Sequence, residues 1–313
     1  MITTTSFHKN HKTLMSKLKL RANVFIHGPT GSGKTKGLIL ASKEVGLPFY
    51  KKLMGNQSSE SSIIGYMSAT GAYVKGSAYD PCVNGGILCL DEVDNGNPNT
   101  TLVANGLADR EMAFPCGMKE AHKDFCLVTT ANTTGGGATL EYCGRNRLDA
   151  AMLNRFEFIE WDYDTTLEKQ IALDKAAEHN PEFDKPKVEL LISDIISLRE
   201  SLKELKILHI ISPRNTLQSV AAMVTGQSPA VILNSIILKG LTIEVKKKIL
   251  MHESAKPKQF KSFNNPEMDY ADETDMGFGE LEKHLSLILK KLPKGERSST
   301  ALKLIMKLDN SNE

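Results

Sequence analysis

One octapeptide near the amino end restricts the fold of this chain more than any other feature. Residues 28–35 read Gly-Pro-Thr-Gly-Ser-Gly-Lys-Thr and fit the pattern G-x-x-x-x-G-K-[ST]. An apolar segment precedes the octapeptide, at residues 23–28, and a helical pattern follows it, at residues 34–45. Strand, glycine-rich turn and helix in that order predict a loop that binds phosphate.

Each residue type in the loop has a chemical reason to be there. The glycines let the backbone curl, so that its N–H groups and the helix N-terminus face phosphate oxygens. We expect Lys34 to contact the β- and γ-phosphates and the Thr35 hydroxyl to ligate Mg²⁺. The candidate nucleotide-binding residues of the loop are Gly28, Pro29, Thr30, Gly31, Ser32, Gly33, Lys34 and Thr35.

Polar side chains end two further apolar segments. Residues 87–91 lead into Asp91 and Glu92, and residues 125–130 lead into Asn132. Given the loop, Asp91 is expected to hold Mg²⁺ directly or through water, and Glu92 to polarise the attacking water. Asn132 would fix that water beside the γ-phosphate. Taken alone, the acids could be a solvated turn, and Asn132 could be a turn former before a glycine run without chemistry.

Arginines supply the remaining candidates. Arg145, Arg147 and Arg155 lie close together in the sequence, and a guanidinium offered to a neighbour's γ-phosphate stabilises transition-state charge. Arg155 is the first choice for that role and Arg147 the second. Arg214 begins a predicted helix and is expected to reach back to the nucleotide. Salt bridges at a domain edge, or a surface position for Arg214, are the alternatives.

The order of elements predicts an α/β fold followed by helices. Buried strands alternating with helices indicate a parallel sheet covered on both faces, an αβα sandwich. The expected strands are 23–28, 51–54, 87–91 and 125–130, with a hairpin over 111–125 and helices over 34–45 and 99–109. A small all-helical lid follows, with helices over 165–179, 187–206, 213–225, 229–238 and 242–252. One more helix, over 280–291, is expected in the tail of the chain.

We expect four parts along the chain. They are a basic N-terminal arm (1–22), a nucleotide-binding domain (23–163), a helical lid (164–252), and a linker with a helical tail (253–313). The arm carries Lys9, Lys12, Lys17, Lys19 and Arg21 and no acid. A solvated helix or arm explains it most simply, while a transit peptide or a phosphate-contacting arm is the alternative.

Charge and cysteine usage exclude several classes of protein. The 39 basic and 37 acidic residues give a net charge of +2, which does not favour a general nucleic-acid binder. Five cysteines form no C-x-x-C pair, which indicates reduced thiols in a cytosol-like compartment. No apolar run approaches the roughly 20 residues of a membrane span, and no secretory pattern opens the chain. We therefore expect a cytoplasmic protein without a membrane partner.

The motif order resembles that of the AAA+ ATPases, and more narrowly of the dynein-related, MoxR-type clade. That clade includes the cobaltochelatase ATPase subunit and Rubisco-activating members. The resemblance covers about residues 20–225. Three further segments are similar to those of the clade. They are residues 65–86 before the acid pair, residues 105–125, and residues 147–156, which contain Leu-Asn-Arg-Phe.

The resemblance implies an αβα nucleotide domain, a helical lid and a ring, commonly a hexamer, with ATP and Mg²⁺ at the subunit interface. By position, Lys34 and Thr35 correspond to Walker A, Asp91 and Glu92 to Walker B, Asn132 to sensor 1, Arg155 to the arginine finger and Arg214 to sensor 2. Asn56 could be a polar switch residue. No metal-binding integrin-type domain is recognisable in the tail, so any such partner would be a separate chain.

These observations lead to one preferred hypothesis and two alternatives. The preferred function is Mg²⁺-dependent ATP hydrolysis coupled to remodelling a separate protein client or adaptor, completed by Arg155 of the next subunit. A nucleotide-driven DNA translocase is the first alternative, because the clade includes a GTP-using restriction subunit and Lys75 and Lys119 could line a pore. The second is a nucleotide-gated scaffold with negligible turnover, against which Glu92 and Asn132 argue.

Overall fold

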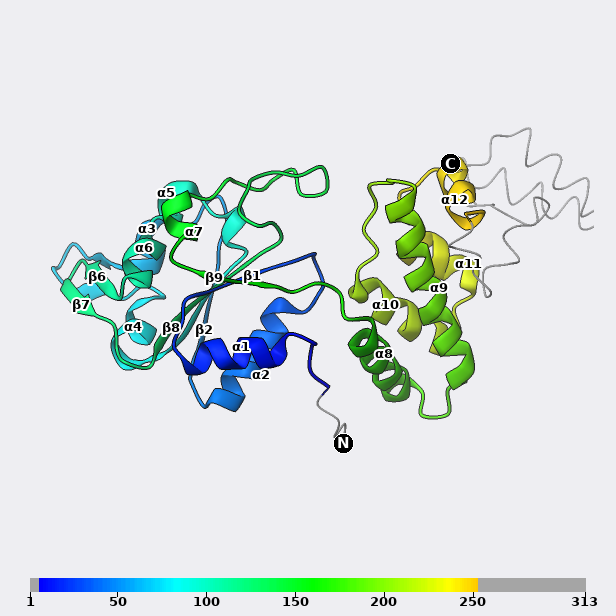
Figure 1. The fold of residues 1–313 in the computed structure, drawn as a ribbon, viewed down its shortest axis with the longest axis horizontal. Coiled ribbons are helices and arrows are strands. Elements are labelled where there is room, and N and C mark those ends of the chain that lie inside the picture. Colours follow the sequence, from blue (N-terminus) through cyan, green and yellow to red (C-terminus); the bar gives the residue numbers. More distant parts are fainter. Residues whose placement is uncertain (1–5, 253–313) are drawn as a thin grey trace, which may run out of the picture. The chain divides into compact units, whose positions relative to one another are not determined.

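The computed structural model describes residues 6–252. All of them belong to the first of two compact units of the chain, residues 1–264. Figure 1 shows the fold of the described residues in colour. The expected linker and tail, residues 253–313 with their last helix, lie outside the described residues, as do the first five residues of the expected arm. The domain boundaries at residues 22, 163 and 252 stay predictions.

A five-stranded sheet carries the phosphate-binding loop. Its strand order is β2-β5-β8-β1-β9, and all neighbouring strands run parallel. The strands are β1 (Val24–His27), β2 (Phe49–Leu53), β5 (Gly86–Asp91), β8 (Phe125–Ala131) and β9 (Glu157–Glu160). The predicted parallel α/β sheet is confirmed, although β2 begins two residues earlier than expected and β9 was not expected.

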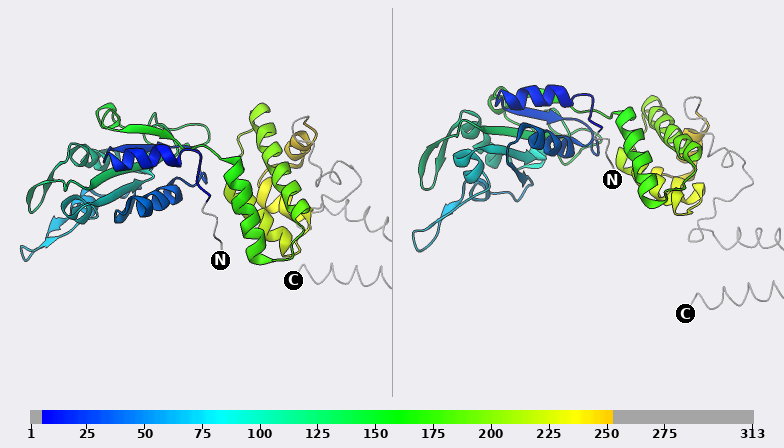
Figure 2. Two further views of the ribbon diagram at one scale, coloured as in Figure 1. Left: turned by 60° about the horizontal axis from the view of Figure 1, so that its bottom comes forward. Right: turned by 90° about the horizontal axis from the view of Figure 1, so that it is seen from below.

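Helices cover both faces of this sheet (Figures 1 and 2). Alternate residues of β1 show the two layers. Val24 and Ile26 pack with helices α1 (His11–Lys19) and α2 (Lys34–Val45), whereas Phe25 packs into the opposite cluster. That second cluster is covered by α3 (Glu60–Ile64), α4 (Tyr79–Asn84), α6 (Val103–Ala108) and α7 (Ala150–Leu153). Strands buried on both faces explain the continuous apolar runs in the sequence.

Shorter elements connect the layers. The predicted helix over 99–109 is interrupted at Leu102, which separates α5 (Pro98–Thr101) from α6. The predicted hairpin is present as β6 (Glu111–Phe114) and β7 (Gly117–Glu120), paired antiparallel. The remaining short elements are β3 (Tyr66–Met67), β4 (Tyr73–Val74) and a 3₁₀ turn, η1 (Val93–Asn95).

Helix α1 differs from the expected solvated arm. Leu14 and Leu18, one turn apart, are fully buried against the sheet layer, whereas Lys12 and Lys19 are exposed and Lys17 pairs with Glu157. Ahead of α1, His8 and Asn10 bond through their side chains to the carbonyl oxygens of Asp162 and Glu160. The basic N-terminal segment is therefore built into the sheet layer as far as it is described.

Helices make up the described chain from Thr165 to Leu250. They are α8 (Thr165–His179), α9 (Lys185–Glu204), α10 (Pro213–Val224), α11 (Pro229–Ile232), a π-helical turn η2 (Leu233–Ile237) and α12 (Ile243–Leu250). These helices share a separate apolar core, and the prediction that helices follow the sheet is confirmed.

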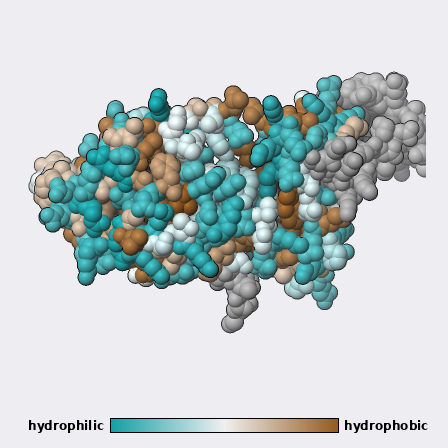
Figure 3. All heavy atoms as spheres, in the orientation of Figure 1, coloured by the Kyte–Doolittle hydropathy of each residue, from teal (hydrophilic) through white to brown (hydrophobic). Residues whose placement is uncertain are grey.

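Hydrophilic side chains dominate the face seen in Figure 3. None of the described helices has the length and apolar character needed to cross a bilayer.

Candidate functional site

The phosphate-binding loop joins the end of β1 to the start of α2. Gly31 and Gly33 have φ angles of +77° and +87°, a left-handed conformation that residues with a Cβ rarely adopt. Gly28 is needed for space, since a Cβ there would lie 2.2 Å from the carbonyl oxygen of Trp161. A curled backbone ahead of a helix N-terminus is the geometry that binds phosphate.

Lys34 connects the loop to the end of β8. Its ammonium donates to the carbonyl oxygens of Gly28 (2.8 Å) and Pro29 (3.0 Å) and to Oδ1 of Asn132 (3.0 Å). Burial lowers the pKa of Lys34 to about 8, and the nearby carboxylates of Asp94, Asp91 and Glu92 only partly oppose that effect. The structure therefore brings Asn132 to the lysine, as the sequence predicts for a strand-end amide.

Asp91 ends β5 as a buried carboxylate with donors on both of its oxygens. Its Oδ1 accepts from the hydroxyls of Thr35 (2.8 Å) and Thr130, and its Oδ2 lies 2.6 Å from Nζ of Lys51. Burial acts to raise the pKa of Asp91, but the hydrogen bonds from Lys51, Thr130 and Thr35 outweigh it and hold the pKa below its ordinary value. Lys51 was not a candidate, because the sequence presents it only as a strand residue.

Glu92 turns away from the strand that precedes it. Its φ angle is +57°, and its backbone N–H donates to the hydroxyl of Thr130 (3.1 Å). The Glu92 carboxylate then meets Nη1 of Arg145 at 3.2 Å. The same nitrogen lies 3.2 Å from Oδ1 of Asp94. Arg145, which the sequence singled out less than its two neighbours, is thus the arginine that contacts the candidate water-activating residue.

Asp94 is a site residue that the sequence analysis did not identify. The side chain is fully buried, and its Oδ2 accepts from the backbone N–H of Asn132 (3.1 Å) and from the N–H and hydroxyl of Thr133 (both 3.0 Å). Through Oδ1 it also holds Arg145. Asp94 therefore fixes the end of β8 and the loop that carries Arg145 relative to Glu92. A third acid in Asp-Glu-Val-Asp was the available signal.

Substituting Asp94 tests this connection. Asparagine cannot accept all the bonds that Asp94 accepts and leaves Arg145 without its buried partner. We expect Asp94→Asn to lower the free energy of unfolding by about 3 kcal/mol, measured by urea titration of the fluorescence of Trp161, the chain's single, fully buried tryptophan. The surface variant Asp80→Asn is the control. Equal stability of the two variants would contradict the role given to Asp94.

The other predicted arginines occupy different places. Arg214 lies in the first turn of α10 and lines the same pocket as the loop. Arg155 lies outside that pocket and forms a two-pronged ion pair with Asp109, at 2.8 and 3.0 Å. Arg147 forms a backbone bridge with Gly136 and does not line the pocket either. Of these three arginines, only Arg214 therefore lies with the other candidate residues of its own chain, whereas Arg145 reaches them through Glu92.

The remaining polar candidate, Asn56, lies near the loop that carries Arg145. Its Oδ1 accepts from the side chain of Asn146 at 3.3 Å, and Asn146 also donates to the carbonyl oxygens of Asp94 and Gly96. Asn56 thus contacts the residue that follows Arg145. Asn146 therefore anchors the loop that carries Arg145 to the turn after the acid pair and to the segment after β2.

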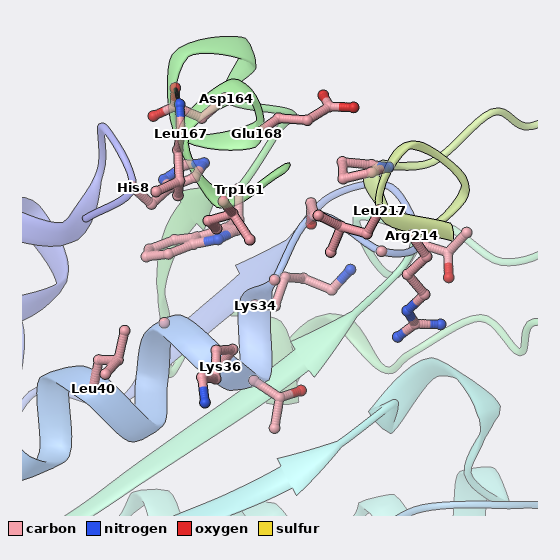
Figure 4. A pocket seen from close by; sticks show the side chains of 18 of the residues that line it. His8, Lys34, Lys36, Leu40, Trp161, Asp164, Leu167, Glu168, Arg214 and Leu217 are labelled. Carbon is pink, nitrogen blue, oxygen red and sulfur yellow. Dashed lines mark hydrogen bonds between the residues drawn. The ribbon is translucent and has the colours of Figure 1, made fainter. Parts of the chain in front are cut away.

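A pocket of about 1020 Å³ is lined by the phosphate-binding loop, the acid pair, Asn132 and Arg214, and it also has an apolar wall. Figure 4 shows Arg214 extending from α10 toward the end of the pocket where Lys34 lies. The wall includes His8, whose ring stacks on Trp161 with centroids 4.1 Å apart, together with Leu167 and Leu217. Sequence analysis missed His8 and Trp161, because only the fold brings these distant residues together.

A chain of contacts links the loop to the helices after Trp161. The hydroxyl of Tyr163 donates to the carbonyl oxygen of Thr30 (2.9 Å), and the guanidinium of Arg199 lies 4.6 Å from the centroid of the Tyr163 ring. Arg199 in turn forms a bidentate ion pair with the buried Glu168, at 2.8 and 3.0 Å. Directional contacts therefore connect the phosphate-binding loop to α8 and α9.

Comparison with known proteins agrees with this geometry. Residues 23–156 match the model of the AAA domain, dynein-related subfamily. An uncharacterized protein of Staphylococcus epidermidis is 26% identical over 198 residues, which cover 59% of this chain and 70% of that protein. A related protein of Staphylococcus saprophyticus is 25% identical over 200 residues, covering 60% of this chain and 71% of its own.

The fold is also found in a solved structure. NtrX from Brucella abortus in complex with ADP is 16% identical, with a TM-score of 0.52, and the match covers 78% of this chain and 57% of that chain. This chain thus spans less than two thirds of the length of NtrX, and the likeness concerns the fold. The family-model match, the motifs and the site geometry agree that residues 23–156 are similar to the AAA domains of the dynein-related subfamily.

Proposed function

We propose that this protein binds ATP and hydrolyses it with Mg²⁺. The observation that carries the proposal is the convergence of Lys34, Thr35, Asp91, Glu92 and Asn132, from three separate segments, at one end of one pocket. The shared fold with NtrX, which has been solved with ADP and with ATP, is in line with it.

The residues present fit a magnesium ion that the nucleotide helps to hold. Thr35 and Asp91 offer a hydroxyl and a buried carboxylate 2.8 Å apart, and Mg²⁺ prefers such oxygen ligands together with water and substrate phosphates. The part of the chain that the structure describes contains no group of three or more histidine, cysteine or acidic side chains placed to hold a metal ion, so the nucleotide would have to supply further ligands. When bound, the ion would neutralise charge on the phosphates.

Each side chain then has a role in the reaction. The loop backbone and the Lys34 ammonium bind the phosphates, and Arg214 adds a second positive charge from α10. Glu92 accepts a hydrogen bond from the attacking water, and Asn132 holds that water in line. The wall of Leu167, Leu217 and the stacked His8–Trp161 pair offers an apolar surface to the base.

We further propose that the protein acts as a ring, commonly six subunits in this family, and that Arg155 completes the site of the next subunit. Arg155 lies outside the pocket of its own chain, and its side chain is one third exposed. Its ion pair with the exposed Asp109 is solvent-screened, so exchanging that partner for a phosphate costs little.

Mixing two inactive variants tests the role of Arg155. Arg155→Ala is expected to lower turnover by about 10³-fold, since a trans arginine typically contributes that much or more, while binding is retained. Adding Glu92→Gln protein should restore activity in mixed assemblies, because one chain supplies Glu92 and the other Arg155. Arg147→Ala, at the second candidate for this role, should keep its turnover if Arg155 is the finger. Full activity of Arg155→Ala alone would contradict the trans role.

We propose that ATP hydrolysis is coupled to the remodelling of a separate protein client or adaptor. ATP-locked Glu92→Gln protein should retain that client in an affinity pull-down, and mass spectrometry would name it. Turnover with GTP, or strong stimulation by DNA, would instead favour a translocase. Tight ATP binding without turnover by the assembled wild-type protein would favour a scaffold.

A further inference from the structure

Lys51 is a basic residue of the site that no motif contains. It lies on β2, paired with Cys89 of the neighbouring β5, and its side chain lines the pocket. Its ammonium is 2.6 Å from Oδ2 of Asp91. A strand-borne lysine thus contacts the carboxylate that the proposed function assigns to Mg²⁺.

The oxygens of Asp91 already have their donors. Oδ1 accepts from Thr35 and Thr130, and Oδ2 faces Lys51. A metal ion next to the Thr35 hydroxyl interacts with Asp91 directly or through a water. The ammonium of Lys51, a residue that lines the pocket, already lies at Oδ2 and therefore competes with the ion for that oxygen. The arrangement of these donors decides which of them leaves most easily.

Thr130 cannot yield, because it is buried on β8, with 1% of its surface exposed. Thr35 is itself a candidate ligand and stays in place. The Lys51 side chain is 43% exposed, so its ammonium can move into water with little desolvation cost. Conversely, a carboxylate as buried as Asp91 is costly without a cation.

We propose that Lys51 is a displaceable counter-cation of Asp91. It keeps the carboxylate charged and oriented before metal binds, and it leaves Oδ2 when Mg²⁺ arrives with the nucleotide. Metal loading is then an exchange of one cation for another, which lowers the apparent affinity for Mg²⁺ and stabilises the metal-free protein. This inference rests on the proposed function.

The test compares Lys51→Met with Lys52→Met. Lys52 is the next residue of β2 and is not among the described residues that line the pocket, so it controls for loss of charge on this strand. Binding of a fluorescent, non-hydrolysable ATP analogue is measured against free Mg²⁺. Mg²⁺ increases the binding of the analogue, and the midpoint of this increase should lie at an about fivefold lower Mg²⁺ concentration in Lys51→Met than in the wild type. Lys52→Met should match the wild type.

Thermal unfolding provides a readout independent of nucleotide. In EDTA, Lys51→Met should unfold at a lower temperature than Lys52→Met, because Asp91 has lost its cation, while Lys51→Arg should stay near the wild type. Unchanged magnesium dependence in a folded Lys51→Met protein would overturn the role of Lys51 alone. Failure of the wild type to bind the analogue at any Mg²⁺ concentration would overturn the proposed function together with it.

Discussion

Replacing Glu92 with glutamine is expected to lower ATP hydrolysis by about 10²–10⁴-fold while ATP binding stays intact. Glutamine has nearly the same shape and can still accept a hydrogen bond from Arg145, so the site keeps its geometry. It lacks the negative charge that polarises the attacking water. Phosphate release under saturating ATP measures the loss, and equilibrium binding of the fluorescent analogue measures what remains.

Glu111→Gln is the matched control for this prediction. Glu111 is an exposed acid at the start of β6, away from the pocket, so neutralising it should leave both rates and affinities unchanged. If Glu92→Gln keeps more than a tenth of wild-type turnover in a fully assembled protein, Glu92 is not the group that activates the water.

Replacing Lys34 with methionine should weaken ATP binding by at least about 100-fold, because charge-assisted hydrogen bonds to phosphate are lost inside a buried site. Lys43→Met, in the last turn of the same helix, is the control, since Lys43 is remote from the loop. Circular dichroism must show that both variants are folded. Equal affinity of the Lys34 and Lys43 variants would contradict the assignment of the loop.

The pH dependence of binding gives Lys34 a second signature. Burial lowers the pKa of this ammonium to about 8. A bound phosphate favours the charged form, so binding takes up a proton once the pH exceeds that value. Affinity should therefore be nearly constant below pH 7 and fall by about tenfold between pH 7 and pH 9. Lys34→Arg, which stays charged in this range, should lose the pH dependence.

The sequence predicts those parts of the site whose residues lie within one continuous motif or directly after an apolar strand. The loop, its strand and its helix are consecutive, so residues 34–45 were predicted as a helix with the ends that α2 has. Asp91 and Asn132 follow mostly apolar strands, and parallel strands end at the same edge of a sheet. That geometry places both residues beside Lys34 without any detailed knowledge of the intervening loops.

The rest of the site depends on contacts between distant residues that have no periodic signature. Arg145 reaches Glu92 across 53 positions, and His8 bonds to the carbonyl oxygen of Asp162 across 154. Strand β9 was missed because Glu-Phe-Ile-Glu buries only Ile159 at the sheet edge. Tertiary pairing, rather than local propensity, makes that segment a strand.

Titrating the wild-type protein with ATP in the presence of Mg²⁺ tests the central claim most directly. Trp161 lines the pocket and is the only tryptophan, so its fluorescence is expected to report occupancy without a label. The account predicts saturable binding of one ATP per chain, abolished in Lys34→Met and retained in Lys43→Met. A folded wild-type protein that binds neither ATP nor GTP, by fluorescence or by calorimetry, would contradict it.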